Sequence, residues 1–412
     1  MAISLNISRI AKSPLPDFVL PAADAVGLYV HIPFCFHKCH YCDFYSITKQ
    51  TPERMAEFVD RILIEAEMWV EQFQSVKSAD RPATLIQPRT IFFGGGTPSL
   101  LPIDQMHRLI DQLAVRFDFS QVNEWTIECN PATVTLEYLQ MLKSTGVNRL
   151  SFGAQSFDRH DLVMLERHHD PEDVPRSISL ARTAGFDRLN LDLIYAVPGQ
   201  SLASWLNTLE QAIHIGTTHL SCYGLTYEPN TPMAVKKRLG QIKAVDEDIE
   251  LQMLHATRAR LREKGFSPYE VSNFSQPNQE CRHNLMYWAG DNYIGLGPSA
   301  ASHVEGVRWK NRGHIGDWES AIDDRLLPIV ETETLTPEHR ARELIYLQLR
   351  LANGINFAQF KSKTNFDAQQ LFAGQLKQLS KQNLLIVHAD GFHVSETGIN
   401  VLDAISAEFL NA

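Results

Sequence analysis

The chain of 412 residues is poor in cysteine, with six in all, and it has no long apolar run. No stretch approaches the roughly eighteen consecutive apolar residues of a membrane span. Residues 1–20 are interrupted by polar residues and prolines, unlike the apolar core of a signal peptide. These absences argue against a membrane-spanning protein and against a small secreted domain held by disulfides. They predict a cytoplasmic protein that buries a full hydrophobic core.

No repeat of roughly 20 to 50 residues is present, which excludes a solenoid. Instead, β-rich runs alternate six times with helical patterns from residue 28 onward. The predicted strands are residues 28–32, 90–96, 124–130, 149–155, 188–195 and 219–225. Such an order predicts a parallel sheet with right-handed crossovers, in the α/β class.

The pattern changes beyond residue 225, where residues 247–265 form an amphipathic helix followed by strand and loop. From about residue 325 the order is helix, helix, hairpin and helix, as in a winged helix. Residues 330–412 contain seven Lys and Arg against nine Asp and Glu, so the basic face of a nucleic-acid-binding domain is missing. We therefore expect three parts: an N-terminal extension (1–27), a partial barrel with an accessory segment (28–324), and a C-terminal helical packing or lid domain (325–412).

Half of the cysteines lie within residues 31–46, HIPFCFHKCHYCDFYS, at Cys35, Cys39 and Cys42. A cytoplasmic chain keeps its thiols reduced, and three cysteines cannot all pair with one another, so disulfides are disfavoured. A zinc site usually has two separated pairs of ligands, and His37 and His40 would crowd so short a loop. Three thiolates fit better on three irons of a cubane 4Fe–4S cluster, with the fourth iron left open.

Further unusual residues follow the predicted strands at their carboxyl ends, where parallel α/β folds hold ligands. A glycine-rich turn at 94–98 follows the second strand, and Glu128 and Gln155 end the third and fourth. Asp192 lies inside the fifth strand among apolar neighbours, where a polar side chain costs stability unless it is paired. Their convergence on one edge of the sheet predicts a binding site.

Simpler interpretations exist for several of these residues. A glycine triplet after a strand is commonly only a tight turn, Glu128 could be a capping or surface carboxylate, and Arg167 could end a solvated helix. Cys129 and Cys222 lie in apolar strands, so they are expected to be core residues. Cys281 is ambiguous because it stands two residues before His283.

Five ordered motifs carry a resemblance to a known family: YVHIPFCFHKCHYCDFYS, FFGGGTPSLL, GAQSF, NLDLIYAVPGQ and CRHNLMYW. They resemble the radical S-adenosylmethionine (radical SAM) family of the anaerobic coproporphyrinogen III oxidase, and more closely its HemW-type heme chaperone branch. The resemblance runs from about residue 27 to the C-terminus. It implies a three-quarter, six-stranded parallel β/α barrel with a small winged-helix-like C-terminal domain.

The resemblance also implies roles for individual residues. Cys35, Cys39 and Cys42 would bind the cluster, whose open iron would chelate S-adenosylmethionine. The backbone of the turn would approach the methionine end of that ligand, and polar side chains would line its pocket. The residues so implied are Gly95, Gly96 and Thr97 in the turn, and Tyr29, Tyr41, Glu128, Gln155, Arg167 and Asp192 in the pocket. Arg167 suits a carboxylate, and the acidic residues suit an ammonium group or ribose hydroxyls.

Two departures from the oxidase branch favour the chaperone branch. Phe44 stands where the oxidase has a further cysteine, and the segment before the first barrel strand is shorter than in the oxidase. HNLMYW, residues 283–288, matches the H-N-x-x-Y-W stretch of the chaperone branch, which implies His283 as a heme ligand. A neutral imidazole among aromatic residues suits heme, although a structural histidine is the alternative. Other candidate histidines are His168, His169, His303 and His314, of which His314 lies near Trp318.

We therefore expect a heme chaperone that binds a 4Fe–4S cluster, S-adenosylmethionine and heme, and that delivers heme to acceptor proteins such as respiratory enzymes. The alternative is an oxygen-independent coproporphyrinogen III oxidase, which decarboxylates propionate side chains in porphyrin biosynthesis. A radical enzyme acting on another substrate is a third hypothesis. The short N-terminal segment and Phe44 predict radical SAM architecture without coproporphyrinogen III dehydrogenase activity. Peripheral membrane contact is compatible with the sequence, and no nucleic-acid partner is expected.

Overall fold

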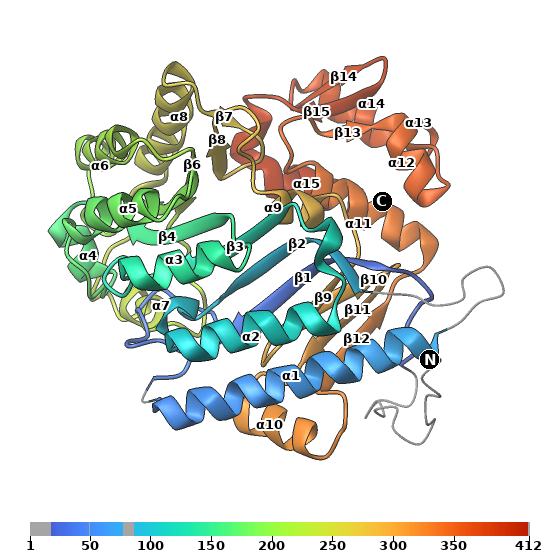
Figure 1. Cartoon of the computed structure of the whole chain (residues 1–412). Helices are drawn as coiled ribbons and strands as arrows, with labels where there is room; N and C mark the ends of the chain where they lie inside the picture. The colour runs from blue at the N-terminus through green and yellow to red at the C-terminus, as the bar shows by residue number, and fades with distance from the viewer. Residues whose placement is uncertain (1–17, 49, 77–85, 411–412) are drawn as a thin grey trace.

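A computed structural model describes residues 18–48, 50–76 and 86–410. Most of the predicted N-terminal extension, residues 1–17, lies outside the described residues. The described chain forms a twelve-stranded sheet, with helices on its outer face and a small three-stranded sheet among the C-terminal helices (Figure 1). None of the helices in these ranges has the length and apolar character needed to cross a membrane.

The six predicted parallel strands are confirmed, and they lie side by side in chain order. They are β1 (Ala25–Ile32), β2 (Ile86–Gly95), β3 (Glu124–Cys129), β4 (Arg149–Gln155), β5 (Arg188–Tyr195) and β6 (His219–Gly224). The helices that connect them are α1 (Pro52–Ser75), α2 (Ile103–Arg116), α3 (Leu136–Ser144), α4 (Arg159–Met164), α5 (Asp173–Thr183) and α6 (Leu202–Ile215), with short turns η2 (Pro98–Leu100) and η3 (Phe119–Gln121). Hydroxyl side chains begin several helices by accepting a backbone N–H: Thr51 for α1, Thr135 for α3 and Ser201 for α6.

The sheet extends beyond the predicted barrel at both edges. β9 (Tyr293–Leu296) pairs in parallel with β1, and β10 (Ala301–Val304), β11 (Val307–Asn311) and β12 (Ile329–Thr334) continue from it as antiparallel strands. At the other edge β8 (Asn273–Ser275) and β7 (Ser267–Pro268) pair with β6 and with each other. The helices of this region are α7 (Pro232–Arg238), α8 (Glu247–Glu263), α9 (Arg282–Trp288) and α10 (Ile315–Asp323).

The C-terminal part has the predicted order of helices, hairpin and final helix. It consists of α11 (Pro337–Gln348), β13 (Ile355–Asn356), α12 (Phe357–Thr364), α13 (Ala368–Leu371), α14 (Ala373–Lys381), β14 (Leu385–His388), β15 (Gly391–Val394), η4 (Gly398–Val401) and α15 (Leu402–Leu410). Phe360, Phe372, Phe392 and Phe409 are buried in a core of its own. β12 still belongs to the large sheet and ends at Thr334, nine residues beyond the boundary predicted at 325. In Figure 1 this part, orange to red, lies beside α9.

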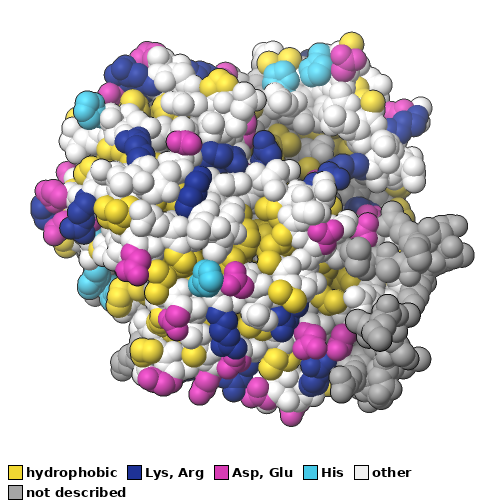
Figure 2. Space-filling view, in the orientation of Figure 1, with side chains coloured by type: hydrophobic (Ala, Val, Ile, Leu, Met, Phe, Trp, Pro, Cys, Tyr) yellow, Lys and Arg dark blue, Asp and Glu magenta, His cyan; other side chains and the backbone are white. Residues whose placement is uncertain are grey.

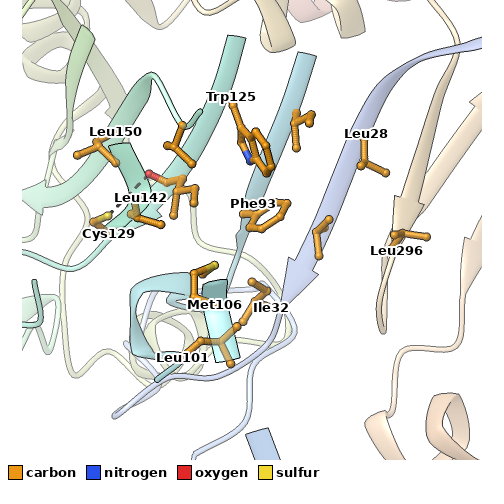
Figure 3. Packing of buried hydrophobic residues seen from close by; sticks show 14 of the residues in the cluster. Leu28, Ile32, Phe93, Leu101, Met106, Trp125, Cys129, Leu142, Leu150 and Leu296 are labelled. Carbon is orange, nitrogen blue, oxygen red and sulfur yellow. Dashed lines mark hydrogen bonds between the residues drawn. The ribbon is translucent and has the colours of Figure 1, made fainter. Parts of the chain in front are cut away.

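The residues of the parallel strands alternate between an apolar outer face and a polar inner face. Leu28, Phe93, Trp125 and Leu150, from four neighbouring strands, point into the layer beneath the outer helices (Figure 3). Cys129 and Cys222 are 4% and 3% exposed, which confirms them as core residues. The inner face instead holds buried polar side chains at Glu124, Thr126, Arg149, Ser151, Asn190 and His219. On the face of the molecule shown in Figure 2, charged side chains of both signs are interspersed.

The side chain of Glu65 on α1 is completely buried and joins the helix to the sheet extension. Its Oε2 accepts hydrogen bonds from the backbone N–H of Gly297 (2.8 Å) and from Trp318 Nε1 (3.0 Å). Its Oε1 accepts from Asn311 Nδ2 (2.7 Å). Burial raises the pKa of Glu65 to about 7, while these three donors favour the charged carboxylate. One side chain therefore holds the β9–β10 connection, β11 and α10 against α1.

We predict that Glu65→Gln destabilises the protein by about 1–3 kcal/mol, because an amide nitrogen cannot accept from the donors now satisfied. Denaturant unfolding, followed by circular dichroism, measures the change. Glu67→Gln is the matched control, since Glu67 is an exposed residue on the same helix. Equal losses in the two variants would contradict a structural role for the Glu65 contacts.

Candidate functional site

The cysteine loop leaves the carboxyl end of β1 and is closed at its base by backbone hydrogen bonds. The N–H of Cys35 donates to the carbonyl of Ile47 (3.0 Å), and the N–H of Ile47 donates to the carbonyl of Pro33 (2.8 Å). Within the loop, the N–H of Cys42 donates to the carbonyl of Cys39 (3.1 Å). All three cysteines are free thiols, so the loop presents three sulfur atoms from one small, tied segment.

The spacing of these sulfur atoms disfavours a single tetrahedral ion. Metal–sulfur bonds of about 2.3 Å place the ligands of one zinc ion about 3.8 Å apart. The sulfur atoms of Cys35, Cys39 and Cys42 do not all lie within 4.8 Å of one another in the described structure. His37 and His40 are also otherwise engaged, because both Nε2 atoms lie 2.9 Å from Glu166 Oε2. The donor set therefore fits a cluster of several metal ions better than it fits one zinc ion.

Arg167 supplies a positive charge beside the thiols. Its Nη1 lies 3.7 Å from Cys39 Sγ, and its Nη2 donates to the carbonyl of Gly153 (2.6 Å). Burial raises the pKa of the Cys42 thiol to about 11 and raises that of Cys35, whereas the guanidinium favours the Cys35 thiolate. The buried Nε of Arg167 has no hydrogen-bond partner in the described structure. An unpaired buried cation donor next to three thiols suits an anionic group bound there, so the simpler interpretation of Arg167 as a solvated helix end is wrong.

Gln155 reaches the same place through an irregularity in β4. The register between β4 and β5 shifts between Gly153 and Gln155, and Gln155 adopts a left-handed φ of 65°. Such a bulge re-aims a side chain at the end of a strand. A Cβ atom on Gly153 would lie 3.0 Å from Gln155 Nε2 and 3.3 Å from Arg167 Nη2. The glycine thus leaves room for both polar groups above the strand.

Two carboxyl groups occupy the adjoining strand ends. Glu128 Oε2 accepts from the N–H of Gly95 (3.1 Å), and Asp192 accepts from Ser151 Oγ (3.1 Å) and Asn190 Nδ2 (2.9 Å). Burial and the neighbouring charge of Asp192 raise the pKa of Glu128 to about 8, and burial raises the pKa of Asp192. The site therefore holds two carboxyls and a guanidinium, a combination that suits a zwitterionic ligand.

The two predicted tyrosines lie close to these charged groups. Tyr29 is close enough to Glu128 for that charge to raise its pKa further, and its hydroxyl donates to His31 Nδ1 (3.1 Å). Tyr41 lies near Arg167 and Asp192, whose charges have opposite effects on its pKa, which burial raises. The structure thus brings the predicted pocket residues into one region at the strand ends.

The glycine turn after β2 is tied to the cysteine loop. The N–H of Gly96 donates to the carbonyl of Ile32 (2.9 Å), and that of Thr97 donates to the carbonyl of Phe34 (2.7 Å). Gly95 has a left-handed φ of 106°, and a Cβ on Gly96 would lie 2.7 Å from the carbonyl oxygen of Phe34. These N–H groups and that of Gly95 already have acceptors in the chain. A ligand bound here could approach the backbone closely, but these three N–H groups would not be free to donate hydrogen bonds to it.

His283 lies on α9, at the opposite end of the barrel interior from the cysteine loop. It is 1% exposed, and its ring stacks on Phe92 with a centroid distance of 5.3 Å. Its Nδ1 lies 2.9 Å from Thr90 Oγ1, and its Nε2 lies 2.9 Å from the hydroxyl of Tyr287. Both ring nitrogens therefore have partners in this structure. Among the alternative histidines, His303 is buried, whereas the side chain of His314 is 71% exposed.

Sequence reasoning missed a polar network that fills the barrel beneath the site. Glu124 forms a 2.7 Å ion pair with Arg188, and His219 Nδ1 lies 2.6 Å from Asn190 Oδ1. The ambiguous Cys281 is buried, and its thiol donates to Glu124 (3.4 Å). A signal was present, because a strand of a covered parallel sheet should be apolar on both faces, whereas RLNLDL in residues 188–193 alternates.

A cavity of about 1110 Å³ extends from the cysteine loop along β1 to the C-terminal helices. Its wall includes Phe44 of the loop, Tyr29 of β1, and Tyr287 and Trp288 of α9. Cationic side chains also line it, namely Lys38, Arg308, Lys310, Arg340, Arg350 and Lys363. Four acidic residues, Asp43, Glu270, Asp291 and Glu343, line it as well. The aromatic surface suits a large, flat ligand, and the cations among these mixed charges offer partners for anionic groups on it.

Comparisons with known proteins agree with this geometry. The family model described as the radical SAM superfamily matches residues 29–212, and a HemN C-terminal domain model matches residues 335–401. A heme chaperone HemW of Bacillus subtilis is 32% identical over 93% of this chain and 98% of its own length, and one of Lactococcus lactis is 30% identical over 93% and 96%. The solved structure of Escherichia coli coproporphyrinogen III oxidase (HemN), described as a radical SAM enzyme, has a TM-score of 0.82 at 24% identity, covering 98% of this chain and 97% of that one.

We predict that Cys35→Ala, Cys39→Ala and Cys42→Ala each lose most of the iron and sulfide taken up during anaerobic reconstitution. A cluster that keeps only two of its three thiolates is poorly retained. Cys129→Ala and Cys222→Ala are the controls, because both side chains are buried in the outer core. Undiminished iron and sulfide in all three loop variants would rule out the assignment.

We also predict that the affinity for S-adenosylmethionine depends on pH. Because the pKa of Glu128 is about 8, this carboxyl is mostly protonated at pH 7, whereas the positively charged groups of S-adenosylmethionine favour the ionised form. Binding should therefore weaken as the pH falls below 8, by up to about tenfold per unit. Calorimetry on cluster-loaded protein between pH 6.5 and 8.5 tests this expectation.

Glu128→Gln should bind more weakly and lose that pH dependence, whereas Glu137→Gln, on the exposed surface of α3, should keep both the affinity and the slope. A slope that persists in Glu128→Gln would assign the titration to another group.

Proposed function

The chain belongs to the HemW family within the radical SAM superfamily, and on that premise we propose that it binds heme and delivers it to acceptor proteins. The observation that carries the proposal is the cavity of about 1110 Å³ whose wall includes the aromatic residues of the HNLMYW helix. Heme is large and flat, so its affinity comes mainly from burial of apolar surface. The aromatic wall offers that surface, and the cations near the C-terminal helices offer partners for two propionates.

Lys310 is one of two cations of this wall, with Lys38 of the cysteine loop, that form no ion pair in the described chain. It is exposed on β11, and no acidic side chain of the described chain lies within ion-pair distance of it. Arg308 and Arg340, by contrast, already pair with Glu333, Glu343 and Glu305. We therefore place one propionate near Lys310.

The superfamily implies a 4Fe–4S cluster and S-adenosylmethionine, and the residues at the strand ends fit both. When bound, a reduced cluster supplies the electron that cleaves a carbon–sulfur bond of S-adenosylmethionine. In our proposal Cys35, Cys39 and Cys42 hold the cluster. Arg167 and Gln155 orient the ligand, and the turn at 95–97 shapes its pocket.

In the same proposal Glu128 and Asp192 balance the positive charge of the ligand, and Tyr29 and Tyr41 close its pocket. Tyr29 also lines the large cavity, so it stands between the two sites. Whether S-adenosylmethionine is consumed or only bound is a separate property from heme binding.

Phe44 weighs against the oxidase alternative. Its side chain is 68% exposed and forms part of the cavity wall beside the cysteine loop, where the resemblance implies a cysteine in the oxidase. The structural likeness to HemN, at 24% identity, shows the fold alone. A role in delivery, with respiratory enzymes among the acceptors, follows from the family proposal.

The implied role of His283 as axial ligand stays a prediction. Its ring lies behind the cavity wall, and both nitrogens are hydrogen-bonded. To bind iron directly through Nε2, His283 would have to give up its contact with Tyr287, and Tyr287 would have to move aside.

We predict that the reconstituted protein, incubated anaerobically with hemin, gives a Soret band and passes heme to apomyoglobin used as a test acceptor. In parallel it should form no protoporphyrinogen from coproporphyrinogen III with S-adenosylmethionine and a reductant. Lys310→Ala should weaken hemin binding, because it removes a propionate partner, whereas Lys377→Ala, in the separate C-terminal core region, should not. Decarboxylated product without a Soret band would replace the chaperone proposal with the oxidase alternative.

A further inference from the structure

The turn that ends α4 contains a residue of a type that does not suit its position. Glu166 follows the helix at a left-handed φ of 53°. The N–H groups of Glu166 and Arg167 donate back to the carbonyls of Val163 (3.1 Å) and Leu162 (2.9 Å), which is the Schellman ending of a helix. A side chain at its left-handed position is sterically unfavourable, and a negative charge is unfavourable at the carbonyl end of a helix. Both local costs point to a compensating contact elsewhere in the fold.

The other helices with this ending show how the same position is filled elsewhere in the described chain. The same pair of backbone hydrogen bonds closes α3, α5, α7, α8 and α9. Their left-handed residues are all glycines, namely Gly146, Gly185, Gly240, Gly265 and Gly290. At the end of α14 the residue is Asn383, a common alternative to glycine. At the end of α10 it is Arg325, a cation that suits a helix C-terminus and pairs with Glu71. Among these helices, only α4 ends on an acidic residue.

The cysteine loop provides the compensating contact of Glu166. His37 Nε2 donates to Glu166 Oε2 (2.9 Å), and His40 Nε2 lies 2.9 Å from the same oxygen. On the other side of its ring, His40 Nδ1 accepts from Lys236 Nζ (2.9 Å). An ammonium group can only donate, so the ring hydrogen of His40 is on Nε2 and faces the carboxylate. One carboxylate oxygen therefore holds two side chains of the loop.

These contacts lie next to the cluster site without forming a second metal site. His37 and His40 flank Cys39, whose sulfur lies 3.7 Å from Arg167 Nη1. The two histidine Nε2 atoms and Glu166 Oε2 do not all lie within 4.8 Å of one another in the described structure, so their geometry does not suit one metal ion. A single turn thus holds the loop by its histidines through Glu166 and reaches its thiol through Arg167.

We propose, on the basis of the cluster assignment above, that Glu166 is a positioning residue that clamps the cysteine loop closed through His37 and His40. Backbone hydrogen bonds tie the loop at its base, and the N–H of Met233 on α7 donates to the carbonyl of His40 (3.0 Å). The clamp fixes the segment around Cys39 from the opposite direction along the chain. Iron reaches a chelator only when the loop opens locally, and contacts made only in the closed loop make that opening rarer.

The test is the rate at which a strong iron chelator removes iron from the anaerobically reconstituted protein. Glu166→Gly should lose iron about three- to tenfold faster than the parent, because the side chains of the pair are one-third exposed and each contact is modest. Glu166→Gln should stay close to the parent, since its amide oxygen can accept from both histidines. Replacing both histidines with alanine should speed the loss in the parent and add little to Glu166→Gly, because both changes remove the same contacts.

Thermal unfolding of the cluster-free protein separates a clamp from a contact that serves only the fold. Glu166→Gly should unfold at about the parent's temperature, because glycine relieves the unfavourable left-handed backbone. Asn383→Gly is the matched control, since it makes the same kind of replacement at the end of α14 and should leave iron loss unchanged.

Three results would overturn the clamp. They are parental iron loss in Glu166→Gly, equally fast loss in Glu166→Gln, and a fall in unfolding temperature that matches the faster loss. A parent that takes up no iron and sulfide would instead overturn the cluster assignment itself.

Discussion

The buried carboxylate of Glu124 is the contact on which the lower half of the barrel depends. It stands on β3 and accepts the first backbone N–H groups of α9, from Arg282 (3.0 Å) and His283 (2.9 Å). Burial opposes its charge, yet Arg149 and Arg188 hold the pKa of Glu124 below its ordinary value. Removing one partner of such a buried set leaves an uncompensated charge, which costs several kcal/mol (about 3–5). The position of α9, and with it the cavity wall, follows from this network.

The barrel interior therefore has two chemically different ends. At the carboxyl ends of the strands, three thiols, one guanidinium and two carboxyls lie on irregular backbone, including the left-handed residues Gln155 and Glu166. At the other end, neutral aromatic and imidazole rings lie on and around α9. The buried Glu124 carboxylate binds the first backbone N–H groups of that helix. Tyr29 connects the two, since it feels the charge of Glu128 and also lines the cavity.

The polar interior of the barrel also explains how the outer helices are held, which is mainly by apolar packing on the strands. With polar groups turned inward, the apolar face of each strand is free to pack against the surrounding helices (Figure 3). In the extension β9 to β12, strand β9 and helix α10 lie against α1, which comes much earlier in the chain. There the buried side chain of Glu65 on α1 binds the turn after β9 and the end of β11.

The sequence by itself determined the six parallel strands, because each carries an apolar period and is followed by a helical one. It also determined the cysteine loop, since the three ligands lie within eight residues of one another. It located the carboxyl-end residues, because the end of every parallel strand faces the same edge. What only the tertiary structure decided was the pairing of residues far apart in the chain. Glu124 meets α9 across 159 positions and Thr90 meets His283 across 193. Those contacts bury His283 behind the cavity wall and leave Asn284, Tyr287 and Trp288 to line it, and local pattern carries no information about either.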